Sequence, residues 1–240
     1  TSKDSQYKIP DVNIPLYWVR PQQILCSDAG SHRFLWNMHY TPLNVPPTYP
    51  ISAIVGETAP APTSPWVMPG TYTIKLTVNG KSYTQPLTVK MDPRVKTSTA
   101  ALQQQHDYSM LCYHDKQKVL SLLKTIGLLQ IQVKLLPGKI RQGNYDSLRN
   151  EIDTCYLKLG MLNHWLIEAS PEDRAPLNEE LQQLFELIEG VDAQPTSQCI
   201  TEVDSAHAQF EKLWHNWELL QQELKELNTL LKDAELTPVK

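Results

Sequence analysis

Apolar residues recur with a period of seven along the C-terminal part of the chain. Two positions of each heptad are apolar: Val203, Phe210, Trp217, Leu224 and Leu231 at the first, and Ala206, Leu213, Leu220, Leu227 and Ala234 at the second. This pattern is typical of a helix that packs as in a coiled coil. Pro195-Thr196 precedes the predicted helix and Pro238 follows it, as expected at helix boundaries.

A second long helix is predicted from residue 97 to about residue 136. It begins at Thr97-Ser98-Thr99, which suits a helix N-cap, and it ends at Pro137-Gly138. Its apolar positions have helical spacing: Cys112, Val119, Leu122, Ile126, Leu129, Val133 and Leu136.

The residues between these two helices carry two apolar stripes in succession. The stripes are Leu148, Ile152, Cys155, Leu159, Leu162 and Leu166, and then Leu177, Leu181, Leu184 and Ile188. Between them, Ser170-Pro171 is a fresh helix start and Pro176 is a second interruption. We therefore expect residues 97–240 to form a long antiparallel three-helix bundle whose middle helix is broken near 169–176. A four-helix bundle is the alternative.

The first part of the chain has the alternating pattern of β-strands. Thr71–Val78 alternates apolar and polar residues, and Asn79-Gly80 is a two-residue turn that favours a hairpin with Lys81–Gln85. Leu87–Lys90 continues beyond Pro86, which suits an edge or a bulge. Earlier strands are predicted at Leu16–Arg20 and Arg33–Tyr40. The spacing predicts an Ig-like or fibronectin-like antiparallel β-sandwich, so that the whole chain is of the α+β class.

Proline content marks the boundary between the two parts. Of 18 prolines, 13 lie in residues 1–96, and we therefore predict two domains, 1–96 and 97–240. Eight prolines fall in an insertion at 41–69. A loop of this length is either functional or a cover for the sandwich. Its aromatic residues Tyr49 and Trp66 suit binding of a sugar or a peptide, although capping the open end of the sandwich is the favoured interpretation.

Charge is unevenly distributed between the two parts. The net charge is −4, made up of +4 in residues 1–96 and −8 in residues 97–240. The acidic balance argues against nucleic-acid binding by the helical part. We expect no membrane span, because no apolar run approaches the ~20 residues that a bilayer requires. The N-terminal residues lack the apolar stretch of a signal peptide, and the missing initiator Met indicates an excised fragment or a mature product.

Residues suited to chemistry are present but form no catalytic or metal-binding motif. Cys26, Cys112, Cys155 and Cys199 form no CxxC pair, so we expect free thiols, with a Cys155–Cys199 bridge as the main alternative. His207 has carboxylates three and four residues away, which is weak support for a metal. No GxSxG, P-loop or GxGxxG motif occurs. We therefore expect no cofactor and no catalytic site in this chain.

Three segments carry a family resemblance: Gly30–Met38, Met68–Gly80 and Leu87–Val95. Together they resemble the carboxy-terminal region of large bacterial sortilin-like β-propeller proteins, which are often labelled glycosyl hydrolases or sialidase-repeat proteins. Pro69-Gly-Thr-Tyr72 is also similar to a turn in the Ig-like domain of flagellar hook-capping proteins. The propeller family has Asp where this chain has Asn37. The final long helix, with the preceding residues 193–198, is similar to the end of the family.

The resemblance implies that a β-propeller lies upstream and that the protein is exported to the periplasm, the cell surface or the medium. Any active site would then lie in that propeller. We expect a non-catalytic module that docks on the propeller, on a copy of itself or on another surface protein. The alternative is a glycan-binding module that uses Trp66, Tyr49 and Trp18. Trp214 of the last helix is expected in the core, or at an interface if it is exposed.

Overall fold

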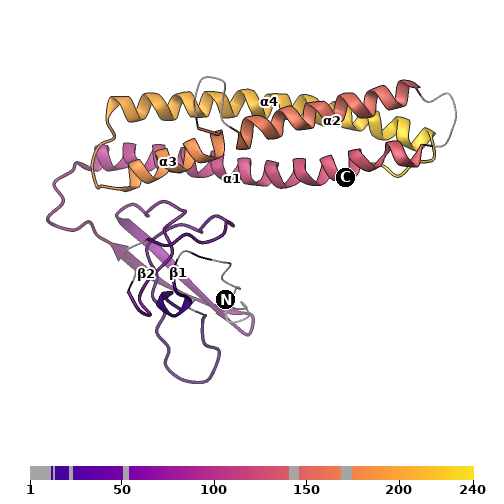
Figure 1. The fold of residues 1–240 in the computed structure, drawn as a ribbon. Coiled ribbons are helices and arrows are strands. Elements are labelled where there is room, and N and C mark those ends of the chain that lie inside the picture. The colour runs from indigo at the N-terminus through magenta and orange to yellow at the C-terminus, as the bar shows by residue number, and fades with distance from the viewer. Residues whose placement is uncertain (1–11, 13, 22–23, 51–53, 141–145, 169–174) are drawn as a thin grey trace. The chain divides into compact units, whose positions relative to one another are not determined.

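The computed structural model describes residues 12, 14–21, 24–50, 54–140, 146–168 and 175–240. The chain contains both α and β structure and divides into two compact units, Thr1–Met91 and Asp92–Lys240 (Figure 1). The elements in order are η1 (Leu16–Trp18), β1 (Gly70–Val78), β2 (Lys81–Val89), α1 (Thr99–Leu135), η2 (Pro137–Lys139), α2 (Asp146–Ile167), α3 (Leu177–Glu189) and α4 (Ser197–Asp233).

The strands β1 and β2 form the hairpin that the Asn79-Gly80 signal predicts. They pair antiparallel, with Val78 opposite Lys81 beside the turn. Asn79 and Gly80 both have positive φ, which a two-residue turn of this kind requires. Pairs of opposite residues in an antiparallel ladder alternate between hydrogen-bonded and non-hydrogen-bonded. Counted from the hydrogen-bonded pair Val78–Lys81 at the turn, the pair Thr73–Pro86 is non-hydrogen-bonded, so Pro86 needs no amide hydrogen there. Pro86 is therefore tolerated within β2, and the hairpin is continuous across it.

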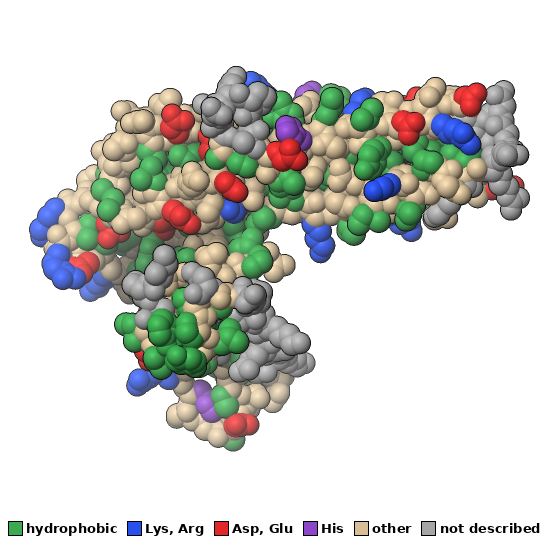
Figure 2. Space-filling view, viewed as in Figure 1, with side chains coloured by type: hydrophobic (Ala, Val, Ile, Leu, Met, Phe, Trp, Pro, Cys, Tyr) green, Lys and Arg blue, Asp and Glu red, His purple; other side chains and the backbone are tan. Residues whose placement is uncertain are grey.

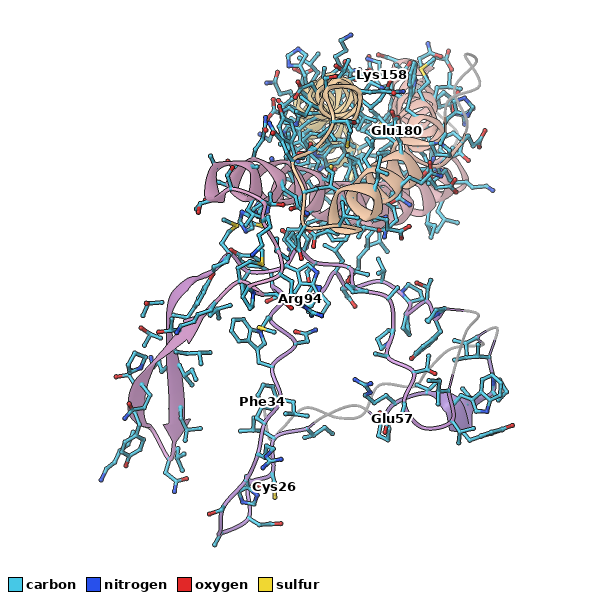
Figure 3. All side chains as sticks on the ribbon, turned by 90° about the vertical axis from the view of Figure 1, so that its left-hand side faces the viewer. Cys26, Phe34, Glu57, Arg94, Lys158 and Glu180 are labelled. Atoms are coloured by element: carbon cyan, nitrogen blue, oxygen red, sulfur yellow. The ribbon has the colours of Figure 1, made fainter. Side chains whose placement is uncertain are left out.

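Of the predicted β-sandwich, the described residues show one antiparallel hairpin. Among the described residues, β1 and β2 are the only strands of the sheet. Leu16–Trp18 is a turn of 3-10 helix instead of a strand, because Pro15 and Pro21 flank it closely. The predicted strand at 33–40 contributes only a single bridge, between His39 and Trp66. Figure 3 shows Cys26 and Phe34 on a segment that runs apart from the hairpin.

The core of the first unit is small. Ile14, Val19 and Tyr49 form its cluster of buried apolar residues, with Val12 and Trp18 against them. Four apolar side chains on one face of the β1–β2 hairpin are exposed: Ile74, Leu76, Val78 and Tyr83. Hairpins of two strands are marginal alone. Trp36 lies against Tyr72 at the far end of this face, so the first unit presents a sheet face that the described residues cover only in part.

The second unit is a helical bundle in which α1 and α4 run parallel and α2 and α3 return between them (Figure 1). Lys116 of α1 bonds to the start of α3 at Asn178, and Gln105 bonds to the end of α3 at Ile188. Helix α3 therefore runs antiparallel to α1 along its N-terminal part. Helix α2 contacts α1 and α4, and it lies along the C-terminal part of α1, whereas α3 lies along the N-terminal part. The predicted broken arm thus consists of two separate helices, and the break itself at 169–174 lies outside the described residues.

The apolar seam of α4 lies in the core of the bundle. Nine of the ten predicted heptad positions are buried, and Ala234 lies against the core at the helix end. The matching stripes of α1, α2 and α3 are buried with it. Side chains also cap the two long helices at their starts. Ser98 accepts a bond from the Ala101 amide, and Thr196 accepts one from the Cys199 amide, each at 3.2 Å.

The C-terminal tail folds back onto the bundle through side-chain amides. Asn228 of α4 bonds to both the amide and the carbonyl of Val239, at 2.8 and 3.0 Å. Gln132 of α1 bonds in the same way to Lys240, at 2.8 Å for both bonds. Val239 is buried in the core. The tail thereby joins the ends of α1 and α4. None of the described helices combines the length and apolarity needed to cross a membrane.

The bundle core predicts a large difference between two leucines of α3. Leu181 is buried and Leu187 is exposed. Leu181→Ala removes buried apolar surface and leaves a cavity, so we expect it to lower the free energy of unfolding by about 2–5 kcal/mol. Leu187→Ala should change the free energy by less than about 0.5 kcal/mol. Urea denaturation followed by circular dichroism measures both. Equal effects would contradict this packing of α3.

Candidate interaction surface

Helix α2 is apolar on its outer face as well as on its inner face. The outer residues Leu157 and Met161 are each 65% exposed, and Trp165 is 57% exposed. They are spaced four residues apart, so they lie on one side of the helix. Tyr156 and Gly160 of α2 lie beside this row, and Leu219 of α4 adds another exposed apolar side chain. We refer to Leu157, Gly160, Met161, Trp165 and Leu219 as the α2 patch.

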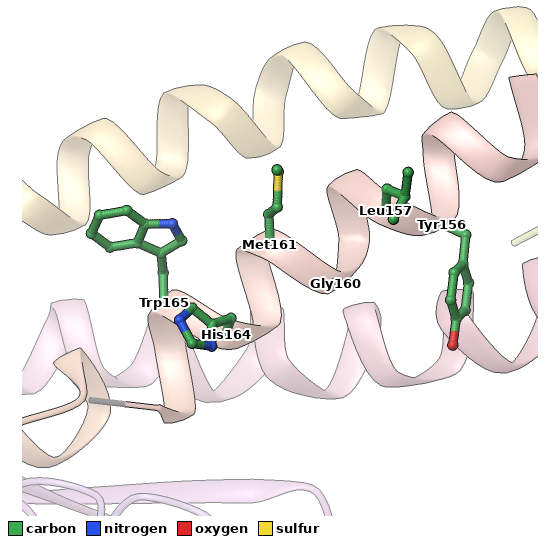
Figure 4. A pocket seen from close by; sticks show the side chains of 6 residues that line it. All are labelled: Tyr156, Leu157, Gly160, Met161, His164 and Trp165. Atoms are coloured by element: carbon green, nitrogen blue, oxygen red, sulfur yellow. The ribbon is translucent and has the colours of Figure 1, made fainter. Parts of the chain in front are cut away.

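The α2 patch borders a shallow hollow between α2 and α4. The hollow has a volume of about 260 Å³, and Met161, Trp165 and Leu219 line it. Figure 4 shows the side chains of Leu157, Met161 and Trp165 projecting to the same side of α2, while Tyr156 projects to the other. In the space-filling view, apolar side chains interrupt the charged surface of the bundle (Figure 2). Exposed apolar side chains gathered on one helix face are a feature of binding surfaces.

Gly160 sits within the α2 patch in the middle of the helix. Glycine costs roughly 0.5–1 kcal/mol in a helix interior relative to alanine. A Cβ at Gly160 would meet no atom within 4 Å, so the packing of the described chain does not require a glycine there. The absence of a side chain leaves room for a partner to approach the α2 backbone closely.

Charged side chains flank the α2 patch. Lys158 Nζ lies 2.5 Å from Glu223 Oε1 of α4 at the edge of the hollow. His164 Nδ1 lies 2.5 Å from Glu168 Oε2 in the last turn of α2. Both pairs are partly exposed, so they contribute little to stability. Their position at the rim and the apolar residues between them match the usual layout of an interface, with an apolar centre and a polar rim.

The residues that the sequence suggests for ligand binding lie in three different places. Tyr49 and Trp18 belong to the small core of the first unit, where Tyr49 is buried. Trp66 is 46% exposed and its ring lies tilted against that of His39, with ring centroids 3.8 Å apart. Trp214 of α4 is partly buried against the bundle core, and Lys118 Nζ lies 5.6 Å from its ring. The structure therefore does not bring Tyr49 and Trp18 together with Trp66 as an exposed platform.

Trp66 instead has aromatic neighbours that sequence reasoning did not select. Trp36 donates from Nε1 to the His39 carbonyl at 3.1 Å, and its ring meets Tyr72 edge-on at 5.9 Å. Tyr72 in turn donates its hydroxyl to the Met68 carbonyl at 2.6 Å. We name Trp36, His39, Trp66 and Tyr72 the aromatic cluster. Its two tryptophans are partly exposed. The sequence feature that could have indicated this cluster is the spacing of Phe34, Trp36 and Met38 at every second position.

A buried polar layer crosses the N-terminal part of the bundle. Asp115 of α1 is buried, and its Oδ2 lies 2.6 Å from His207 Nδ1 of α4. Burial raises the pKa of Asp115, and the contact with His207 opposes that rise. Gln105 donates to the carbonyls of Ile188 and Val191 at 2.8 and 2.7 Å, which satisfies the end of α3. Ser109 of the same layer bonds to the Glu189 carboxylate.

The Asp115–His207 pair has the form of a base and its orienting carboxylate. The nearest thiol on α1 is Cys112, one turn away and fully buried. Burial raises the pKa of Cys112 to about 12 and that of Cys155 to about 11, so neither thiol ionises at neutral pH. All four cysteines are free, and the alternative Cys155–Cys199 bridge is not formed. The layer acts as a set of satisfied buried contacts between helices.

In the described parts of the chain, no group of three or more His, Cys, Asp or Glu residues is arranged to hold a metal ion. No family model matches this chain, and no curated protein or solved structure matches it either.

The polar layer predicts a pH dependence of stability that comes from Lys116. Burial lowers the pKa of Lys116 from 10.5 to about 8. Between these values the unfolded chain binds more protons than the folded chain, so the free energy of unfolding rises with pH. From pH 7 to pH 9, Lys116 should contribute a rise of about 1 kcal/mol.

Lys116→Met keeps the apolar stem and removes the charge, so the variant should lack this rise. Urea denaturation of both proteins at pH 7 and pH 9 measures it, and cysteine titration cancels in the difference. Parallel pH profiles for the two proteins would contradict the prediction.

Proposed function

We propose that this chain is a non-catalytic structural and interaction module that acts by docking on another protein. The α2 patch carries the proposal. It gathers exposed apolar side chains around a hollow, on a helix whose opposite face is fixed in the bundle core. Rigid support of an apolar centre favours binding, because little conformational entropy is lost on association.

The family resemblance extends the proposal. It implies that the module follows a β-propeller in a larger exported bacterial protein, and that the propeller is a docking partner. The Ig-like sandwich belongs to the same proposal. The partly covered face of β1 and β2, with Ile74 and Leu76, suits completion by further strands or by a neighbouring domain.

Light scattering on a sizing column tests the docking function. The chain is measured alone and after mixing with the separately produced upstream region of its gene. We expect an assembly, either with that region or of the chain itself, that Met161→Glu weakens at least tenfold, because a charge would be buried in the apolar centre. Ile131→Glu, at an equally exposed apolar site on α1, is the control and should retain the assembly. Assembly that neither variant alters, or no assembly, contradicts a docking role for the α2 patch.

Glycan binding is a second candidate, and the aromatic cluster favours it. Partly exposed Trp36 and Trp66 flank His39 and offer ring faces of the kind that stack on apolar sugar faces. This site differs from the one suggested by sequence, since Tyr49 and Trp18 lie in the small core.

Tryptophan fluorescence titrated with a panel of oligosaccharides tests the second candidate. We expect a saturable change that Trp66→Ala abolishes. Tyr17→Ala should leave it intact, since Tyr17 is an exposed aromatic outside the aromatic cluster. Fluorescence that no glycan in the panel alters would contradict glycan binding.

A further inference from the structure

We propose that the α2 patch binds the α2 patch of a second copy of this chain, with the two α2 helices antiparallel and crossing at Met161. The inference rests on the proposed docking function and names its partner. The following contacts and charges support a second copy.

The exposed row on α2 is symmetric about its centre. Leu157 and Trp165 lie four residues on either side of Met161. A two-fold axis through Met161 would therefore place Leu157 of one copy against Trp165 of the other, and Met161 against Met161. A two-fold interface uses the same patch on both copies, so the patch must complement itself. Apolar residues at all three positions satisfy this requirement.

Gly160 lies beside the proposed crossing point. Helices normally pack with axes 8–10 Å apart, and small residues at the contact allow the shorter distances. The site has open space in the described chain, and Met161 and Leu157 stand on either side of the gap. Side chains of a second copy would fill this gap, which gives the helix-interior glycine a role.

The local charge also suits a second copy. Residues 97–240 carry a net charge of −8, so two copies repel each other over most of the bundle surface. On α2, however, no acidic residue occurs between Asp153 and Glu168. The one charged residue of that stretch, Lys158, is paired with Glu223 of its own chain. The α2 patch is thus a place where two acidic bundles can meet without opposing carboxylates at the centre.

The length of α2 sets how far a contact between two copies can extend. Helix α2 has 22 residues, which corresponds to ~33 Å of length. A specific interface buries about 800 Å² on each partner. The contact of two α2 helices would extend onto Leu219 and the hollow beside α4, and it has to bury an area of that order.

Cysteine cross-linking tests both the contact and its direction in the full chain. Cys26 is exposed and is first replaced by Ser, while the other three cysteines are buried. In this background, Met161→Cys should form a disulfide-linked dimer of about twice 27.4 kDa under mild oxidation. Leu157→Cys alone should not cross-link, but a mixture of Leu157→Cys and Trp165→Cys should. The Cys26→Ser protein with no introduced cysteine should be a dimer by light scattering. Adding Met161→Glu to it should give a monomer.

Ile131→Cys is the control for random collision, because Ile131 is exposed to a similar degree on α1. Equal cross-linking of Ile131→Cys and Met161→Cys would overturn the proposal. So would cross-linking of Leu157→Cys alone, which requires parallel helices. A chain that stays monomeric yet binds the upstream region through Met161 would overturn self-association and leave the docking function standing. A monomer that binds no protein would overturn both.

Discussion

The burial of one apolar seam along α4 is the interaction on which the rest of the bundle depends. Helices α2 and α3 have 22 and 13 residues, and helices in proteins gain most of their stability from packing of an apolar face. α1 buries several polar and charged side chains in its N-terminal part, including Gln105, Asp115 and Lys116. The continuous apolar contact therefore comes from α4, whose ten buried residues extend through nearly the whole helix. The short helices are stable because they close over this seam.

The seam also determines which surface the molecule exposes. Helix α2 has apolar residues on both faces, and only one face fits against α1 and α4. Once Leu159 and its stripe are buried, Leu157, Met161 and Trp165 are directed outward. The α2 patch thus follows from packing on the opposite side of the same helix. In the first unit the situation is similar, since the hairpin buries neither face among the described residues and leaves Ile74 and Leu76 exposed.

The sequence predicted the elements that local rules determine. The heptads of α4, the N-cap within Thr97–Thr99 and the hairpin at Asn79-Gly80 all form, because periodicity, capping and turn geometry act over a few residues. Strand pairing depends on distant partners, so the alternating pattern also predicted strands at 16–20 and 33–40 that do not join the sheet among the described residues. The α2 patch was missed because a helix with two apolar faces has no single stripe to follow. Burial of Lys116 was also missed, because spacing alone does not show that its charged end reaches a carbonyl of α3.

The folded-back tail has a consequence for helix register. A heptad repeat fits its partner nearly as well after a shift of seven residues, so a long seam alone does not select one alignment of α4 with α1. The amides of Asn228 and Gln132 hold Val239 and Lys240 through four bonds, one pair on each helix. Sliding α4 along α1 would separate these two anchors and break one pair. The tail therefore fixes the register of α4 relative to α1, two helices that run parallel.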